Sequence, residues 1–193
     1  MQNLKAIQTR IHDLLTELKS LETEVVNFVE SASKDPLTKL LRRETFLEQY
    51  ESLSNTHSTL CLLVLDVDHF KKVNDRLGHA GGDRVLQAVA DVIGNTPGSI
   101  SGRFGGEEFL VAIPGELGFA TARAETLRKE IALLSGDLTC TISIGVAQMK
   151  PMENFTTLFE RADQALYAAK NEGRNRVSVA TDSVSCGAKL QVG

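Results

Sequence analysis

The first 33 residues carry apolar side chains at alternating intervals of three and four positions. These positions are Leu4, Ile7, Ile11, Leu14, Leu18, Leu21, Val25 and Phe28. The spacing is the a and d pattern of a coiled coil, held for about four heptads without a glycine or proline. Residues 1–33 are therefore predicted to form one long helix with a narrow apolar stripe. We expect the stripe to pair with a second copy in a parallel homodimer, and packing on the chain's own domain is the alternative.

Residues 34–180 alternate between helical and strand-like patterns, which predicts an α/β domain with helices covering a mixed sheet. Asp35-Pro36 indicates a helix start, with Asp35 as N-cap and an apolar face that continues to Tyr50. The nearly continuous apolar runs at 60–65 and 139–147 predict central strands. Further elements are expected at 70–77 (helix), 85–93 (helix), 117–134 (helix), 155–172 (helix) and 176–180 (edge strand). Residues 181–193 have no periodicity and are predicted to be a disordered tail.

Two carboxylates follow two glycines in Arg103-Phe104-Gly105-Gly106-Glu107-Glu108-Phe109, which we call the glycine hairpin (residues 103–109). Strand-like runs flank it at 99–102 and 110–113, so a simple hairpin turn is one interpretation. Like charges at a tight turn repel unless a cation compensates them. A second acidic group, Asp66-Val67-Asp68, ends the apolar run at 60–65, where open α/β sheets bind ligands. The pair of acidic groups favours a metal site beside a nucleotide.

The composition limits the classes of partner. The chain has 193 residues, 42% hydrophobic and 24% charged, with a net charge of −4. This charge argues against a nucleic-acid groove, so phosphate binding has to be local. No run of roughly 18 apolar residues indicates a membrane span, and no secretory leader is evident. Cys61, Cys140 and Cys186 lack metal-ligand spacing and fit a reducing cytoplasm, where we expect the protein to reside.

Several motifs, taken in order, resemble those of the GGDEF domains of diguanylate cyclases over roughly residues 34–180. They are Asp35-Pro36-Leu37-Thr38 after the coiled coil, Asp66-Val67-Asp68-His69-Phe70-Lys71-Lys72-Val73-Asn74-Asp75, Gly78-His79 with Gly82-Asp83, the glycine hairpin in its GGEEF form, Ser143-Ile144-Gly145-Val146, and Ala168-Ala169-Lys170 with Gly173-Arg174-Asn175. The resemblance implies a nucleotidyl-cyclase-like fold with a ferredoxin-like palm. It also implies condensation of two GTP molecules into cyclic di-GMP and two pyrophosphates, at the interface of a homodimer.

The resemblance assigns the metal ligands and the groups next to the reacting atoms. Asp66, the backbone carbonyl of Val67 and Glu107 match ligands of Mg²⁺ or Mn²⁺, with two ions in each active half-site. Glu108 is expected either to help bind the second ion or to assist deprotonation of the 3′-hydroxyl. Asp68 is expected to be structural and to pair with a basic neighbour.

Other matched positions would bind the nucleotide. The backbone around Phe70 and the side chains of Lys71, Lys170 and Arg174 match phosphate contacts, together with the turn of Gly105 and Gly106. Asn74 and Asp83 match residues that recognise guanine. The assignment is sharper for Asp83, because a carboxylate accepts from N1–H and N2–H₂ of guanine. The sequence alone equally allows Asp83 to be the N-cap of the next helix. His79 matches a family position and is expected to serve loop structure.

Two regions depart from the family pattern. Thr96 and Ser99 replace the Arg and Asp of an inhibitory product site, so no such site is expected. Lys39 stands where the family tends to have Gly, Arg42 where it has Asn, and Glu44 where it has Arg. These last departures predict altered packing between the coiled coil and the catalytic domain.

Rival interpretations differ in class. A catalytically silent GGDEF module that binds GTP or cyclic di-GMP as a sensor is the main alternative. A purely structural dimerisation module and a different nucleotidyl cyclase are the others, and Asp83 disfavours the last. An upstream sensor domain absent from this chain is expected to supply the input signal.

Overall fold

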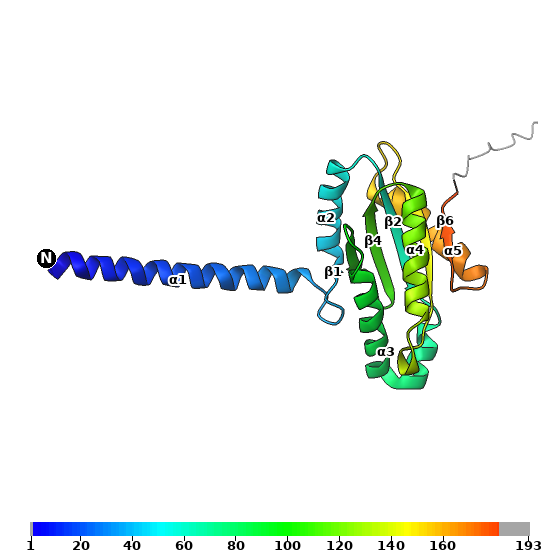
Figure 1. The fold of residues 1–193 in the computed structure, drawn as a ribbon, viewed down its shortest axis with the longest axis horizontal. Helices are drawn as coiled ribbons and strands as arrows, with labels where there is room; N and C mark the ends of the chain where they lie inside the picture. The colour runs from blue at the N-terminus through cyan, green and yellow to red at the C-terminus, as the bar shows by residue number, and fades with distance from the viewer. Residues whose placement is uncertain (1, 182–193) are drawn as a thin grey trace, which may run out of the picture.

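The computed structural model describes residues 2–181 and consists of one long helix followed by an α/β domain (Figure 1). Helix α1 (Gln2–Ser33) projects away from the domain as a rod, which confirms the helix predicted there. Its stripe from Ile11 to Phe28 stays solvent-exposed, with Leu14 the least exposed of these side chains at 48%. Packing of this stripe on the chain's own domain, the alternative considered from the sequence, is therefore excluded.

The domain is built on a six-stranded sheet in the order β1-β3-β4-β2-β5-β6. Its strands are β1 (Leu41–Arg42), β2 (Leu60–Val67), β3 (Ile100–Arg103), β4 (Glu108–Pro114), β5 (Ile142–Gln148) and β6 (Val177–Val179). The outer pairs β1–β3 and β5–β6 are parallel, and the inner pairs are antiparallel. Every residue of β2 is buried, because it is flanked by β4 and β5 and covered on both faces. The predicted mixed sheet is confirmed.

Helices cover both faces of this sheet. One face carries α3 (Phe70–Gly94) and α4 (Leu117–Ala132), and the other carries α2 (Arg43–Thr56) and α5 (Phe155–Asn171). A short 3₁₀ turn, η1 (Gly136–Leu138), precedes β5. In β2 the odd-numbered side chains pack with α3 and α4, and the even-numbered ones pack with α2 and α5. This alternation turns Asp66, at the end of β2, toward the α5 face.

Helix α5 approaches the sheet most closely at Gly145 of β5. A Cβ atom at this position would collide with the carbonyl oxygen of Ala162 and the backbone nitrogen of Leu166. The glycine of the Ser143-Ile144-Gly145-Val146 motif therefore serves packing. Lys170 lies one helical turn beyond Leu166, so the close approach brings Lys170 toward the end of β2.

The helix start predicted at Asp35-Pro36 is wrong. Residues 36–38 form a turn, and α2 begins only at Arg43, after the unpredicted strand β1. The carboxylate of Asp35 accepts from the backbone N and Oγ1 of Thr38, which closes the turn instead of capping a helix. Lys39 then takes a left-handed conformation (φ 62°), which explains why glycine suits this position.

The predicted loop between two helices at residues 78–83 is also wrong. Helix α3 runs through this segment with a kink at Gly78 (φ 71°, ψ 171°). Gly81 and Gly82 are helical and buried, and Asp83 lies within the helix with an exposed side chain. The N-cap role considered for Asp83 is thereby excluded, because the helix does not start there.

Cys61 and Cys140 lie in the core. Burial raises the pKa of Cys61 to about 12 and that of Cys140 to about 11, with smaller contributions from Glu116 and Asp68. Cys186 and the predicted disordered tail lie outside the described residues, apart from Thr181. Within residues 2–181, no helix combines the length and apolar character needed to cross a membrane.

Candidate functional site: a carboxylate cluster at the end of the central strand

The two acidic groups predicted from the sequence meet at the end of β2. Asp66 lies directly opposite Glu108 in the β2–β4 ladder. The carbonyl oxygen of Glu107 accepts from the backbone N–H of Val67, at 3.3 Å. Asp66 is 6% exposed, whereas Glu107 is half-buried and Glu108 is exposed. The strand end and the glycine hairpin thus bring three carboxylates together.

A lysine from α5 partly compensates this negative charge. Lys170 Nζ lies 2.9 Å from Asp66 Oδ2. Burial nevertheless raises the pKa of Asp66, with a further contribution from Asp68, while Lys170 and Arg174 oppose the rise. Burial and the charges of Asp66 and Glu108 likewise raise the pKa of Glu107 against the effect of Lys170. Burial is the largest cause of both rises, so the shielding from water at this strand end disfavours the charged carboxylates.

The donor set fits a hard divalent cation only in part. Within residues 2–181, no group of three His, Cys, Asp or Glu side chains is arranged to hold a metal ion. Asp66 and Glu107, two of the ligands expected from the sequence, lie close enough for the charge of Asp66 to raise the pKa of Glu107. Mg²⁺ is commonly bound by one or two carboxylates plus phosphate oxygens of a substrate. The residues present fit that mode of binding.

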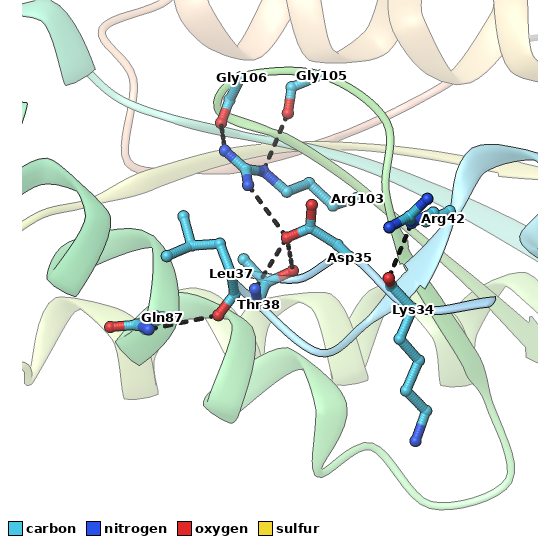
Figure 2. A network of polar contacts seen from close by, with 9 residues as sticks. All are labelled: Lys34, Asp35, Leu37, Thr38, Arg42, Gln87, Arg103, Gly105 and Gly106. Carbon is cyan, nitrogen blue, oxygen red and sulfur yellow. Dashed lines mark hydrogen bonds and ion pairs between the residues drawn. The ribbon is translucent and has the colours of Figure 1, made fainter. Parts of the chain in front are cut away.

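Arg103 holds the glycine hairpin from within (Figure 2). Its Nε donates to the carbonyl of Gly105 at 3.2 Å, and its Nη2 donates to that of Gly106 at 2.7 Å. Its Nη1 lies 3.1 Å from Asp35 Oδ1. Since Glu107 follows Gly106 directly, the guanidinium fixes the backbone that presents this carboxylate.

The segment between α1 and α2 is tied to the same hairpin. Asp35 joins Arg103 while closing its own turn, and Gln87 of α3 donates to the carbonyl of Leu37 (Figure 2). Arg42 Nε donates to the carbonyl of Lys34 at 2.9 Å. Strand β1 also pairs with β3, which places Arg42 opposite Arg103. The segment that follows α1 is therefore bound, through hydrogen bonds and an ion pair, to β3, the strand that precedes the glycine hairpin.

Several residues that the sequence predicts to contact phosphate or base lie around the start and the kink of α3. His69 precedes the helix in a left-handed conformation (φ 56°), and Lys71 is exposed in the first turn. Phe70 packs in the core, which leaves only its backbone for a ligand. A Cβ atom at Gly82 would collide with Asn74 Oδ1, so the side chain of Asn74 lies against the turn that carries Asp83. His79 is exposed just beyond the kink.

The loop in place of the product site turns its polar groups inward. Thr96 is buried, and among the described residues its Oγ1 has no hydrogen-bond partner. Ser99 Oγ donates to the carbonyl of Thr96 at 2.8 Å. The loop therefore presents neither an arginine nor a carboxylate to a ligand.

Sequence reasoning assigned Asp68 the wrong kind of partner. Its carboxylate accepts from Thr141 Oγ1 and Ser143 Oγ, both at 2.7 Å, and from the backbone N–H of Asn175 at 3.0 Å. No basic side chain of the described residues pairs with it. The structural role is as expected, but hydroxyl groups and one amide perform it. Of these partners, only Ser143 belonged to a motif singled out in the sequence, and that motif indicated a strand, not a hydrogen-bond donor to Asp68.

Fold and site together define a class: a three-layer α/β domain with a carboxylate cluster at the end of a central strand. A family model described as diguanylate cyclase, GGDEF domain, matches residues 32–176. The chain belongs to this family.

Curated relatives and solved structures agree with the family. Diguanylate cyclase DgcM of Escherichia coli K12 is 40% identical over 88% of this chain and 43% of its own length. Diguanylate cyclase DgcP of Pseudomonas aeruginosa is 36% identical over 92% of this chain and 28% of its own length. The chain thus spans less than half the length of these relatives.

The structure is similar to the coiled coil and GGDEF domain of DgcB from Caulobacter crescentus, solved with c-di-GMP. The TM-score is 0.80 at 35% identity, covering 90% of this chain and 99% of that one. The diguanylate cyclase SiaD of Pseudomonas aeruginosa, solved with its activator SiaC, has a TM-score of 0.74 at 31% identity, covering 93% and 77%.

Replacing Asp35 by Ala should lower the free energy of unfolding at pH 7 by about 1–3 kcal/mol, as for other hydrogen bonds to charged groups. Burial alone would raise the pKa of Asp35, but the bonds from Thr38 and Arg103 lower it below its usual 3.8. Because the folded pKa is the lower one, the stabilisation is present above about pH 4 and is lost as the pH falls through the folded pKa.

Urea denaturation of both proteins from pH 7 to pH 3, at one protein concentration, measures this loss. The difference between parent and Asp35→Ala should shrink toward acid pH. Asp91→Ala, which removes an exposed carboxylate of α3, is the control and should show no such trend. A difference for Asp35→Ala that stays constant with pH would contradict the ionic role of Asp35.

Proposed function

We propose that this chain is a diguanylate cyclase domain that condenses two GTP molecules into cyclic di-GMP and two pyrophosphates. The observation that carries the proposal is the cluster of Asp66, Glu107 and Glu108 beside Lys170, in a chain of the GGDEF family. Burying and crowding carboxylates is unfavourable unless a ligand compensates them. A domain with a purely structural role would gain nothing from this arrangement.

The reaction joins the 3′-hydroxyl of one GTP to the α-phosphate of the other, twice, with pyrophosphate as leaving group. Asp66, Glu107 and the Val67 carbonyl would hold Mg²⁺ or Mn²⁺, two ions in each half-site. Such ions neutralise charge on the phosphates and polarise the attacked phosphorus. The protein's own task is to hold the nucleotide so that attack occurs in line.

Cationic side chains would bind the triphosphate around this cluster. Lys170 reaches Asp66 from α5, and Arg174 lies near enough to affect the pKa of Asp66. Lys71 projects from the first turn of α3, where N–H groups favour an anion. Gly106 leaves room for a ligand to approach the backbone, whereas the space beside Gly105 is taken by the carboxylate of Glu108. Glu108, exposed opposite Asp66, would serve the second ion or the proton of the 3′-hydroxyl.

Asn74 and Asp83 would read the base. Both belong to α3, where Asn74 lies against Gly82, the neighbour of Asp83 in sequence. The carboxylate of Asp83 is exposed and is not used as a helix cap, so it is available to accept from N1–H and N2–H₂ of guanine. Adenine offers no such pair of donors, which favours GTP over ATP as substrate.

Helix α1 would supply the homodimer that the reaction needs, because each protomer holds one GTP. Its stripe is exposed over the part whose side chains are described, and a two-stranded coiled coil would bury it. The similar DgcB structure contains a coiled coil with its GGDEF domain. An upstream sensor would act through this helix.

A catalytically silent sensor remains the alternative from another class. Solved relatives include GGDEF domains in complex with c-di-GMP, which shows that binding of this nucleotide occurs in the family. In this chain, Thr96 and Ser99 turn inward where a product site would lie, while Asp66, Glu107 and Glu108 are all present. The combination favours turnover over sensing.

Purified protein incubated with GTP and Mg²⁺ should form cyclic di-GMP, resolved by chromatography. Glu107→Gln keeps the shape of the side chain and removes its charge, so activity should fall by about 100-fold or more. Glu51→Gln, on the exposed face of α2, should behave as the parent. Absence of product from the parent, with GTP still bound, would point to the sensor instead.

Replacing Leu14 and Leu18 together by Glu should cut specific activity sharply at low protein concentration, because like charges would face each other across the coiled coil. Activity should recover partly at high concentration, as mass action restores the dimer. Thr16→Glu with Ser20→Glu adds the same charge on the opposite side of α1 and is the matched control. Equal loss in both double variants would contradict the proposed seam.

Initial rates measured with added cyclic di-GMP should show no inhibition at submicromolar product, because the loop of Thr96 and Ser99 offers no charged partner. A variant carrying Thr96→Arg and Ser99→Asp restores the two residues and should gain inhibition. Submicromolar inhibition of the parent, abolished by changes in this loop, would show that the loop binds product in another way.

A further inference from the structure

Asp68 lies two residues beyond Asp66, directly after the end of β2, yet its surroundings are entirely different. Asp66 faces Lys170, while Asp68, at 5% exposure, accepts three hydrogen bonds from neutral donors. Two donors are the hydroxyls of Thr141 and Ser143, next to and within β5. The third is the backbone N–H of Asn175. With three acceptor positions in use, this carboxylate is occupied by the protein itself.

The turn at residues 173–175, to which Asp68 is hydrogen-bonded, has an unusual backbone conformation. Gly173, Arg174 and Asn175 all have positive φ values, of 115°, 63° and 46°. A left-handed conformation is unfavourable for residues other than glycine, and two successive ones persist only when neighbours hold them. Three hydrogen bonds stabilise this turn. The N–H of Arg174 donates to the carbonyl of Ala169, Arg128 donates to Asn175 Oδ1 at 2.9 Å, and the N–H of Asn175 donates to the carboxylate of Asp68.

This turn carries Arg174, whose charge acts on Asp66. Asp68 is also followed directly by His69 and the start of α3, and its own N–H donates to the carbonyl of Thr141. One buried carboxylate thus joins the end of β2 to β5 and to the turn after α5. The segments that would flank the triphosphate meet at this residue.

We infer that Asp68 is a positioning residue that fixes the left-handed turn at 173–175 and thereby aims Arg174 at the terminal phosphates of the nucleotide. This inference rests on the proposed function. Asp68 itself touches neither substrate nor metal. Its role is to hold Arg174 in one conformation before the nucleotide binds. Without Asp68, the conformational entropy of Arg174 would be lost on binding and would weaken the affinity.

The test measures binding of 3′-deoxy-GTP, which lacks the attacking hydroxyl and is not turned over, and of GMP, which lacks the terminal phosphates. Asp68→Ala should weaken binding of 3′-deoxy-GTP by about tenfold, a typical loss for a displaced charge-assisted contact, and leave binding of GMP unchanged. Arg174→Ala should show the same selectivity. In the double variant the loss should be no greater than in Arg174→Ala alone, because the two residues act through one contact.

Asp68→Asn separates positioning from charge. An amide oxygen can still accept from the N–H of Asn175, and the hydroxyl of Ser143 can turn to accept from the amide nitrogen. Affinity for 3′-deoxy-GTP should therefore stay within about threefold of the parent, as expected for a retained neutral hydrogen bond. Asp137→Ala, an exposed carboxylate of η1, is the control for a lost charge.

Three results would overturn the inference: equal losses for both nucleotides in Asp68→Ala, additive losses with Arg174→Ala, or an Asn variant as weak as the Ala variant. The last would indicate a metal or charge role. If Asp68→Ala does not fold, Arg128→Ala releases the same turn and should give a smaller loss of the same selectivity. A parent that binds 3′-deoxy-GTP without forming product from GTP would overturn the proposed activity and leave this inference standing.

Discussion

Negative charge at the end of the most buried strand is the constraint on which the rest of the structure depends. Strand β2 is covered on both faces and flanked on both sides, so a carboxylate at its end is shielded from water. Asp66 there faces Glu108 across the ladder and adjoins Glu107. Burial and mutual repulsion raise the pKa of Asp66 and of Glu107. A cation held between the carboxylates counters both effects without protonating them, and Lys170 supplies part of this compensation.

The two aspartates of Asp66-Val67-Asp68 have different roles: Asp68 is held by hydrogen bonds within the protein, whereas Asp66 pairs with Lys170 in the carboxylate cluster. Their side chains point to the same face because they are two residues apart. Asp68 already accepts three hydrogen bonds from hydroxyl and amide donors of the protein, two on Oδ2 and one on Oδ1. Asp66 has one lysine, whose flexible stem and single point charge can move to a phosphate. The difference comes from their neighbours on β5 and α5, which the spacing of the aspartates does not reveal.

The sequence predicted the strands of the core and the cluster of carboxylates, because long apolar runs and charges at their ends are strong local signals. It failed where glycine and aspartate have more than one use. Gly78, Gly81 and Gly82 indicated a loop, but only Gly78 leaves the helical conformation, and the other two allow close packing within α3. Asp35-Pro36 indicated a helix, but Asp35 closes a turn and binds Arg103, which lies 68 positions further along the chain. Such long-range partners have no local signature.

The departures from the family pattern bear on whether the domain turns over GTP or senses a nucleotide. Lys39 adopts the left-handed conformation that glycine would favour, and Thr96 and Ser99 fold inward in place of a charged pair. These three positions lie in loops, and none of them belongs to the charge cluster. A GGDEF domain that no longer catalyses would become more stable by losing one of these carboxylates, because replacing a buried, crowded charge removes its desolvation penalty. Asp66 and Glu107 are instead both present with raised pKa values, and Arg103 still fixes the backbone next to Glu107. An unfavourable cluster that is kept together with its support accords with the proposed turnover of GTP.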